Sequence, residues 1–166
     1  MDAIVQAAMA KWPNVPDVYG WLALNARGRW WLRDAPLTDT RLIDFISRNY
    51  QPDARGRWHF QNGPQRVFAR CGAAPLVLAF DDAGRLLDHL GRVVDGVEAL
   101  WLDENGRVWL ATTLGPASLD DRALDHFACE LVGPDEAPKW RGLPLTSGAR
   151  NDIVHQLHFV PDPHAD

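Results

Sequence analysis

The sequence predicts an α+β fold in which two repeated β-hairpin-plus-helix units pack as one domain with a mostly antiparallel sheet. The first observation is an internal repeat, because residues 21–32 return in thinned form at 99–110 at an offset of 78 positions. The second is the alternation of apolar and polar residues up to Gly-containing turns, which is typical of hairpins. The third is an apolar stripe of helical period after each hairpin. Copies of one supersecondary unit are expected to pack on each other and share a core.

The repeat continues into the expected helices after an insertion of four residues, where the offset becomes 82. We expect superposition of the two halves to place Trp31 on Trp109 and Phe45 on Phe127. The residues matched at the second offset are Leu37 with Leu119, Asp39 with Asp121, Leu42 with Leu124, Phe45 with Phe127 and Trp58 with Trp140.

The repeat predicts three regions, namely an N-terminal helix and linker over 1–17, repeat unit 1 over 18–97 and repeat unit 2 over 98–166. Turn residues and periodicity define the elements of the first two regions. In order, these are a helix over 3–11 broken by Pro13 and Pro16, strands over 18–24 and 29–32 around a turn at 25–28, a helix through Asn49 capped by Thr38 or Thr40, a hairpin centred on Gly56-Arg57, a turn at 62–64 and a strand over 76–80.

The same signals define the third region, although the two copies no longer align after Trp140. Its helix carries the apolar stripe expected of a helix packed on a sheet. In order, the elements are strands near 98–103 and 107–112, a helix from 119 to 131 capped by Ser118, a Pro- and Gly-broken loop over 133–148, and a last strand over 152–160 before a polar end.

A Gly-Arg pair closes or follows a turn four times, at Gly28, Gly56, Gly84 and Gly106. Gly takes the left-handed position that such turns require, and the following Arg starts the return strand on its solvated face. The alternative is that the four arginines on equivalent turns form a positive rim.

Composition excludes several classes of partner. The chain has 17 basic and 22 acidic residues, and its net charge is −5. Nucleic-acid binding needs a basic stripe, whereas these arginines alternate with acids, so we expect no nucleic-acid partner. No apolar run approaches the roughly 20 residues of a membrane helix, and Asp2 stands where a signal peptide carries basic residues. We expect no membrane partner, and a cytoplasmic protein in which Cys71 and Cys129 are reduced.

The aromatic composition is unusual, with 8 Trp against 2 Tyr. Trp usually buries most of its ring, so we expect these residues to join the sheet to the helices. The alternative is a Trp-lined site for a sugar or another ligand.

Signals for catalysis and metal binding are weak. His155 and His158 would suit a metal on a helix, but residues 153–160 alternate as a strand, which directs the two side chains to opposite faces. Cys71 lies in none of the known nucleophile motifs. The acid pairs at 81–82 and 120–121 are explained by turn and helix-dipole preferences. We therefore expect no catalytic residue, no metal and no cofactor.

Polar and aromatic side chains gather around one hairpin and the helix end that precedes it. Amide and guanidinium groups over aromatic walls suit a small polar or anionic ligand or a peptide carboxylate. The alternative is a helix cap by Asn49 and a polar hairpin tip. We expect such a site to face the seam between the two halves. The candidate ligand-binding residues are Arg48, Asn49, Tyr50, Arg57, Trp58, Gln61, Asn62, Gln65 and Arg66.

Short motifs follow one another at 28–32 with 35–37, 42–46, 56–60, 63–67 and 74–77. Their order resembles that of the uncharacterised proteobacterial family DUF1285, and the chain is also similar to the family DUF2944. The resemblance covers roughly residues 20–130 and implies a repeated helix-and-sheet fold and a role in signalling. The family's Thr-Pro-x-Glu-Lys strand is replaced here by Gly63-Pro64-Gln65-Arg66, so a binding role that needs its acid is not implied. Fold transfers more readily than function in such a resemblance.

Three functions are consistent with these observations. The leading hypothesis is a non-catalytic cytoplasmic binding or regulatory module for a small polar or anionic ligand or a protein partner. The second is a hydrolase or transferase of unfamiliar type that uses the hairpin cluster around His59 and Arg66. The third is a homo-oligomeric interaction protein with a Trp-rich interface. Loss of turnover in His59→Ala would favour the second, and self-association at micromolar concentration would favour the third.

Overall fold

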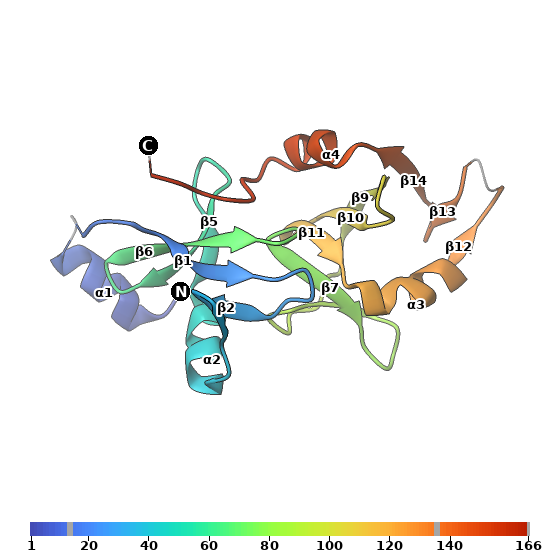
Figure 1. Ribbon diagram of the computed structural model, residues 1–166. Coiled ribbons are helices and arrows are strands. Elements are labelled where there is room, and N and C mark those ends of the chain that lie inside the picture. Colours follow the sequence, from blue (N-terminus) through green and yellow to red (C-terminus); the bar gives the residue numbers. More distant parts are fainter. Residues whose placement is uncertain (13–14, 135–136, 166) are drawn as a thin grey trace. The chain divides into compact units, whose positions relative to one another are not determined.

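Figure 1 shows the computed structural model, which describes residues 1–12, 15–134 and 137–165. Helices and two sheets with mostly antiparallel pairing form an α+β fold, so the predicted class is confirmed. The chain divides into two compact units, which we describe separately. The first unit comprises residues 1–25, 29–72 and 159–166, and the second comprises 26–28 and 73–158. The repeat boundary at 97/98 stays a prediction.

The sheet of the first unit is centred on β1 (Val18–Leu24), which pairs in parallel with β6 (Gln65–Cys71) and antiparallel with β2. Its strand order is β3-β2-β1-β6-β5-β4. The strand expected at 18–24, the hairpin around Gly56-Arg57 and the turn at 62–64 are all present. The remaining strands are β2 (Trp30–Leu32), β3 (Ala35–Pro36), β4 (Tyr50–Pro52) and β5 (Trp58–Asn62).

Two helices belong to the first unit. α1 (Ala3–Lys11) has the predicted bounds, although Pro13, expected to help end it, lies outside the described residues. α2 (Thr40–Arg48) ends one residue before the predicted end at Asn49, which is its C-cap, and Thr38 and Thr40 do not cap its start. Asp39 Oδ1 instead accepts hydrogen bonds from the backbone N–H groups of Arg41 and Leu42, at 2.9 and 3.2 Å. A carboxylate at this position also complements the positive end of the helix dipole.

The sheet of the second unit has the order β12-β13-β14-β9-β10-β11-β7-β8. The predicted strand at 76–80 and the hairpin near 98–103 and 107–112 are confirmed. The loop expected over 133–148 is wrong where two strands lie, and residues 135 and 136 of that stretch lie outside the described residues. The strands are β7 (Leu76–Phe80), β8 (Leu86–Asp88), β9 (Val97–Asp103), β10 (Val108–Thr112), β11 (Gly115–Leu119), β12 (Leu131–Val132), β13 (Lys139–Trp140) and β14 (Leu143–Gly148).

The helix expected over 119–131 is shorter and is capped differently. A 3₁₀ turn, η1 (Asp121–Ala123), leads into α3 (Leu124–Cys129). Ser118 does not cap it, because this residue is fully buried inside β11. Asp120 caps the turn instead, with its Oδ1 accepting from the backbone N–H of Arg122 at 2.9 Å.

The strand expected at 152–160 is wrong, because α4 (Arg150–Gln156) occupies that stretch. Ile153 and Leu157, one helical turn apart, are both buried, so this apolar pair follows the helical period. The ring centroids of His155 and His158 lie 6.2 Å apart. Across the described residues, no cluster of three His, Cys, Asp or Glu side chains could hold a metal ion. In the same part of the chain, the helices are too short or too polar to cross a membrane.

Six strands of each sheet share one connectivity, and the second sheet has β7 and β8 in addition. Each has three antiparallel strands, then a helix, then three strands of which the last returns parallel to the first, as β6 does to β1 and β14 to β9. Leu22 pairs with Leu32 in the first sheet, and Leu100 pairs with Leu110 in the second, which matches the offset of 78 positions. The duplication of one unit stays a prediction that superposition of the two sheets tests.

One proposed equivalence does not follow the strand pairing. Trp140 lies opposite Leu131, the first residue of the strand that follows the helix. The corresponding first residue in the other sheet is Tyr50, and it lies opposite Phe60 rather than Trp58. Pairing therefore matches Trp140 with Phe60.

Tryptophans contribute to the cores of both units. In the first, Trp30 and Trp58 are buried, and each ring centroid lies 4.9 Å from that of Tyr50. In the second, Trp140 stacks on Phe127 of α3 with centroids 5.6 Å apart, which joins sheet to helix as expected. Such aromatic pairs contribute roughly 0.5–1.5 kcal/mol beyond their buried area.

Candidate ligand-binding site

The residues of the predicted cluster separate onto two faces of the first unit's sheet. Directly opposed residues of an antiparallel pair share a face, and neighbours along one strand point to opposite faces. Gln61 opposes Arg66, whereas Asn62 opposes Gln65. The sheet therefore divides the hairpin residues into an arginine side and an amide side.

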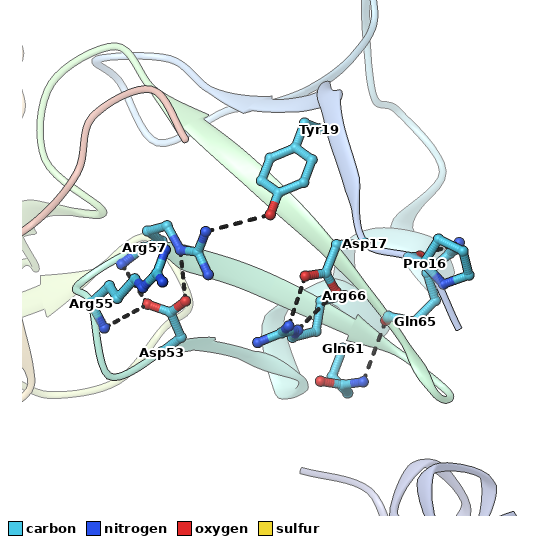
Figure 2. A network of polar contacts seen from close by, with 9 residues as sticks. All are labelled: Pro16, Asp17, Tyr19, Asp53, Arg55, Arg57, Gln61, Gln65 and Arg66. Atoms are coloured by element: carbon cyan, nitrogen blue, oxygen red, sulfur yellow. Dashed lines mark hydrogen bonds and ion pairs between the residues drawn. The ribbon is translucent and has the colours of Figure 1, made fainter. Parts of the chain in front are cut away.

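On the arginine side, Arg57 is held by the turn that precedes it. Asp53 Oδ2 accepts from Arg57 Nε at 2.7 Å, and Asp53 Oδ1 accepts from the backbone N–H groups of Arg55 and Arg57 (Figure 2). The Tyr19 hydroxyl lies 3.4 Å from Arg57 Nη1. Burial raises the pKa of Asp53, but the hydrogen bonds from Arg57 and Arg55 outweigh it and leave the pKa below its usual value. Arg57 is therefore engaged by its own turn.

This arrangement recurs as an Asp-x-x-Gly-Arg turn. In each case the Asp Oδ1 accepts two backbone N–H groups and the Gly has a positive φ. The Gly-Arg pair was recognisable in the sequence, and the acid four residues before Arg57, Arg85 and Arg92 is the additional signal. Arg57 and Arg85, two of the proposed rim, are thus bound to acids. The Asp Oδ2 to Arg Nε distances are 2.7 Å for Asp53–Arg57, 2.8 Å for Asp81–Arg85 and 2.7 Å for Asp88–Arg92.

Arg66 is engaged by a carboxylate from a distant part of the sequence. Its Nε and Nη2 donate to Oδ1 and Oδ2 of Asp17 at 2.9 and 2.7 Å, which is a bidentate pair (Figure 2). The Arg66 guanidinium carbon lies 5.5 Å from the Phe68 ring centroid, and Tyr19 stacks on the same ring at 4.8 Å. The pair is partly exposed, since 39% of the Arg66 side chain and 22% of the Asp17 side chain are accessible to solvent.

Gln61 and His59 are buried beside these arginines. Gln61 is 2% exposed and donates from Nε2 to the Gly63 carbonyl at 2.8 Å. His59 is 3% exposed, and burial together with the charge of Arg66 lowers the pKa of its imidazole. Its Nδ1 contacts no hydrogen-bond partner within the described residues. At neutral pH this imidazole is therefore uncharged and enclosed.

Two other predicted residues have structural contacts at the end of α2, and two more lie in the core. Asn49 Oδ1 accepts from the backbone N–H of Asp2 at 2.9 Å, and Arg48 Nε lies 3.3 Å from an Asp2 carboxylate oxygen. Asn49 Nδ2 also donates to a backbone carbonyl of α2, as the capping alternative predicts. Tyr50 and Trp58 are in the core, where the Tyr50 hydroxyl lies 3.9 Å from the thiol of Cys71.

The amide side opens onto a groove of about 610 Å³, which we call the α2 groove. Residues of α2, β1, β2, β5 and β6 line it, including the predicted residues Asn62 and Gln65. Its apolar walls were not predicted, because their periodicity is that of an ordinary core. They include Leu22, Leu32, Leu42, Ile46, Phe60 and Val67.

The polar rim of the α2 groove carries little net charge. Asp17 lines it, and the bidentate contact with Arg66 neutralises this carboxylate. Gln65 Nε2 donates to the carbonyl of Pro16 at 3.1 Å, so the Gln65 amide oxygen can accept from a ligand. Asn62 is exposed and offers both a donor and an acceptor. The groove thus pairs an apolar body with a neutral hydrogen-bonding end.

Two solved structures are similar to this chain in fold. One is a DUF1285 family protein from Silicibacter pomeroyi DSS-3, with 14% identity, a TM-score of 0.60, and coverage of 92% of this chain and 98% of that one. The other is a DUF1285 family protein from Shewanella baltica OS155, with 16% identity, a TM-score of 0.51, and coverage of 66% and 91%. At these identities the likeness concerns the fold alone.

No curated protein matches the chain. A family model, DUF2944, described as "Protein of unknown function (DUF2946)", matches residues 1–164. The similarity to DUF1285 and DUF2944 expected from the short motifs is therefore confirmed. The chain belongs to the DUF2944 family.

Proposed function

We propose that this protein is a non-catalytic cytoplasmic binding module with a regulatory role, which takes a small amphipathic ligand in the α2 groove. The observation that carries the proposal is the groove itself, at about 610 Å³ with apolar walls and two amides at its rim. Ligand sites commonly enclose 300–1,000 Å³ and combine apolar walls with a few polar groups, as this groove does.

The rim favours a neutral head group that donates a hydrogen bond. The Asp17 carboxylate is paired with Arg66, and the Gln65 amide oxygen accepts without a charge. An anionic head group would lie near the Asp17 carboxylate. None of the described lining residues is a cation that would offset the free-energy cost of desolvating that anion. A primary amide or hydroxyl on an apolar chain fits better.

The groove lining supports binding rather than turnover. Its polar members include Asp17, Tyr19, Asn62 and Gln65; the carboxylate among them is already engaged by Arg66, and the Tyr19 hydroxyl by Arg57. Covalent catalysis needs an activated nucleophile beside a base. His59 points to the sheet face opposite Asn62, so it does not supply that base to the groove.

The cytoplasmic assignment is supported by the two thiols. Cys71 and Cys129 are unpaired in the structure, and Cys129 is exposed. Free exposed thiols persist where glutathione and thioredoxin keep cysteines reduced.

Calorimetric titration with octanamide and octanoate tests the proposal. We expect octanamide to bind and octanoate to bind about tenfold more weakly, since the rim is neutral. Leu42→Trp places an indole at the groove wall and should abolish octanamide binding. Arg41→Trp adds the same ring to an exposed position of α2 and serves as the matched control.

Two results would overturn the proposal. One is equal octanamide affinity in the Leu42→Trp variant and the wild type, with both folded by circular dichroism. The other is the absence of a binding signal for octanamide in the wild type. Native mass spectrometry of the freshly purified protein complements the titration, because a retained mass lost in Leu42→Trp would identify the natural ligand class.

A further inference from the structure

We propose a second binding site in the first unit, separate from the α2 groove, that takes a small aromatic carboxylate between Arg33 and Arg70. It lies above Ala23, a residue of the central strand β1. Leu22 lines the α2 groove and also borders the larger cavity of this second site, whereas the adjacent Ala23 points to the opposite face of the sheet and does not line the groove. We call this site the Ala23 hollow.

The hollow arises because a small side chain stands between two large ones. Ala23 pairs with Trp31 on one side and with Arg70 on the other. Two adjoining cavities, of about 430 and 320 Å³, share Ala23, Arg33 and Arg70 in their linings. The smaller cavity also includes Trp31 and the end of β6, and none of the described residues that line it carries a carboxylate. A benzoate-sized molecule fits a space of this size.

The second unit fills the corresponding position. By strand pairing, Trp101 stands where Ala23 stands, between Trp109 and Thr146. The second sheet therefore has an indole in place of the hollow and a hydroxyl in place of the Arg70 guanidinium. The open space and the cation occur together in the first unit, which is expected of a binding site rather than of a packing fault.

The two arginines differ in their partners from three others of this unit. Arg48, Arg57 and Arg66 each form an ion pair with an Asp. Within the described chain, Arg33 and Arg70 contact no carboxylate at ion-pair distance. A planar guanidinium binds a carboxylate through two parallel hydrogen bonds, so a pair facing one cavity favours this anion.

Arg33 is held in place from the side away from the anion. Its guanidinium carbon lies 3.7 Å from the Trp21 ring centroid, and stacking leaves the N–H edges available to a ligand. Its backbone N–H donates to the Trp21 carbonyl at 2.6 Å, and its φ of 53° lies in the left-handed region. A non-Gly residue in that region is uncommon, and such conformations cluster at binding sites.

A residue that lines the smaller cavity carries one further donor. Trp31 lines it, and the indole Nε1 is buried without a hydrogen-bond partner among the described residues. A buried N–H left unpaired costs about 1–3 kcal/mol, which a carboxylate oxygen would relieve. The larger cavity carries Asp34, Asp162 and His164, so we place the anionic end in the smaller one.

Titration calorimetry with benzoate at low ionic strength tests this site. We expect the wild type to bind benzoate, and Arg70→Gln and Arg33→Gln each to weaken binding at least about tenfold. Ala23→Trp, which copies the second unit, should abolish it. Arg41→Gln removes one charge from an exposed position outside the hollow and should leave the affinity unchanged. Arg70 is exposed, so its variant is expected to fold even where Ala23→Trp does not.

Three results would overturn the assignment. They are the absence of benzoate binding up to about 10 mM, equal affinity in Arg70→Gln and wild type, and binding of inorganic phosphate in preference to benzoate. Octanamide binding in the same Arg70→Gln sample reports the α2 groove independently. Failure of the Ala23 hollow is thereby distinguished from failure of the proposed function.

Discussion

Replacing Asp53 should lower the stability of the first unit, by an amount that depends on which of its two carboxylate oxygens the new side chain retains. Oδ1 accepts from the backbone of Arg55 and Arg57 at 2.9 and 3.0 Å, and Oδ2 accepts from Arg57 Nε at 2.7 Å. The Asp53 and Arg57 side chains are only 10% and 12% exposed. At a net 0.5–1.5 kcal/mol per bond, Asp53→Ala should lower the free energy of unfolding by about 2–4 kcal/mol. Asp53→Asn keeps Oδ1 and should cost about 1 kcal/mol, since Asn25 accepts from Arg29 at 2.9 Å in the corresponding turn.

Guanidinium-induced unfolding followed by tryptophan fluorescence measures both variants. The pKa of Asp53 lies below its ordinary value in the fold, so its contribution is present above the unfolded pKa of about 3.9. That contribution is lost as the pH falls through the lower folded pKa, and the difference between wild type and Asp53→Ala should shrink there. Equal destabilisation by Asp53→Asn and Asp53→Ala at pH 7, or an unchanged unfolding midpoint in both variants, would contradict these roles of the two oxygens.

Three further predictions follow from buried and paired groups. Burial lowers the pKa of His89 to about 4. As the pH drops, the unfolded chain therefore binds this proton before the folded protein does, and the free energy of unfolding should fall between pH 6.5 and pH 4. The free energy of unfolding of His89→Gln, measured at several pH values, should fall less steeply over that range. Burial raises the pKa of the Cys71 thiol to about 12, whereas Cys129 is exposed. Mass spectrometry after iodoacetamide treatment at pH 8 should therefore show one modified cysteine in the native protein and two in urea. Two modified cysteines in the native protein would contradict the burial of Cys71. Arg66→Gln removes a partly exposed ion pair with Asp17 and should lower the free energy of unfolding by less than about 1 kcal/mol, as measured by denaturant unfolding. A larger loss would show that the ion pair stabilises the fold more than its exposure implies.

Local sequence patterns predicted much of the fold. Strand 18–24, strand 76–80 and helix 3–11 have the expected bounds, because alternation and turn residues are local signals. The strand predicted over 152–160 is wrong because the apparent alternation over 153–160 is not the pattern that the fold buries. The helical spacing of Ile153 and Leu157, which the structure buries, decides that segment instead.

The candidate site was less predictable, for a physical reason. Gln61 and Asn62 are neighbours in sequence, yet the pleat of β5 directs them to opposite faces. Arg66 pairs with Asp17, which is far away in sequence, and no local sequence pattern predicts that contact. Asp53 stands four residues before Arg57, so this pair was visible in the sequence. The α2 groove and the Ala23 hollow both depend on strand register, which the local pattern of apolar and polar residues does not determine by itself.

The most direct measurement of the proposed ligand site is an NMR titration of ¹⁵N-labelled protein with octanamide. Side-chain amide signals report Asn62 and Gln65 at the rim of the α2 groove, and those of Gln6 and Gln156, which are not among the groove's lining residues, serve as internal controls. We expect saturable shifts of the Asn62 and Gln65 signals with unchanged control signals. Unchanged rim signals at saturating octanamide, or shifts confined to residues outside the groove, would contradict it.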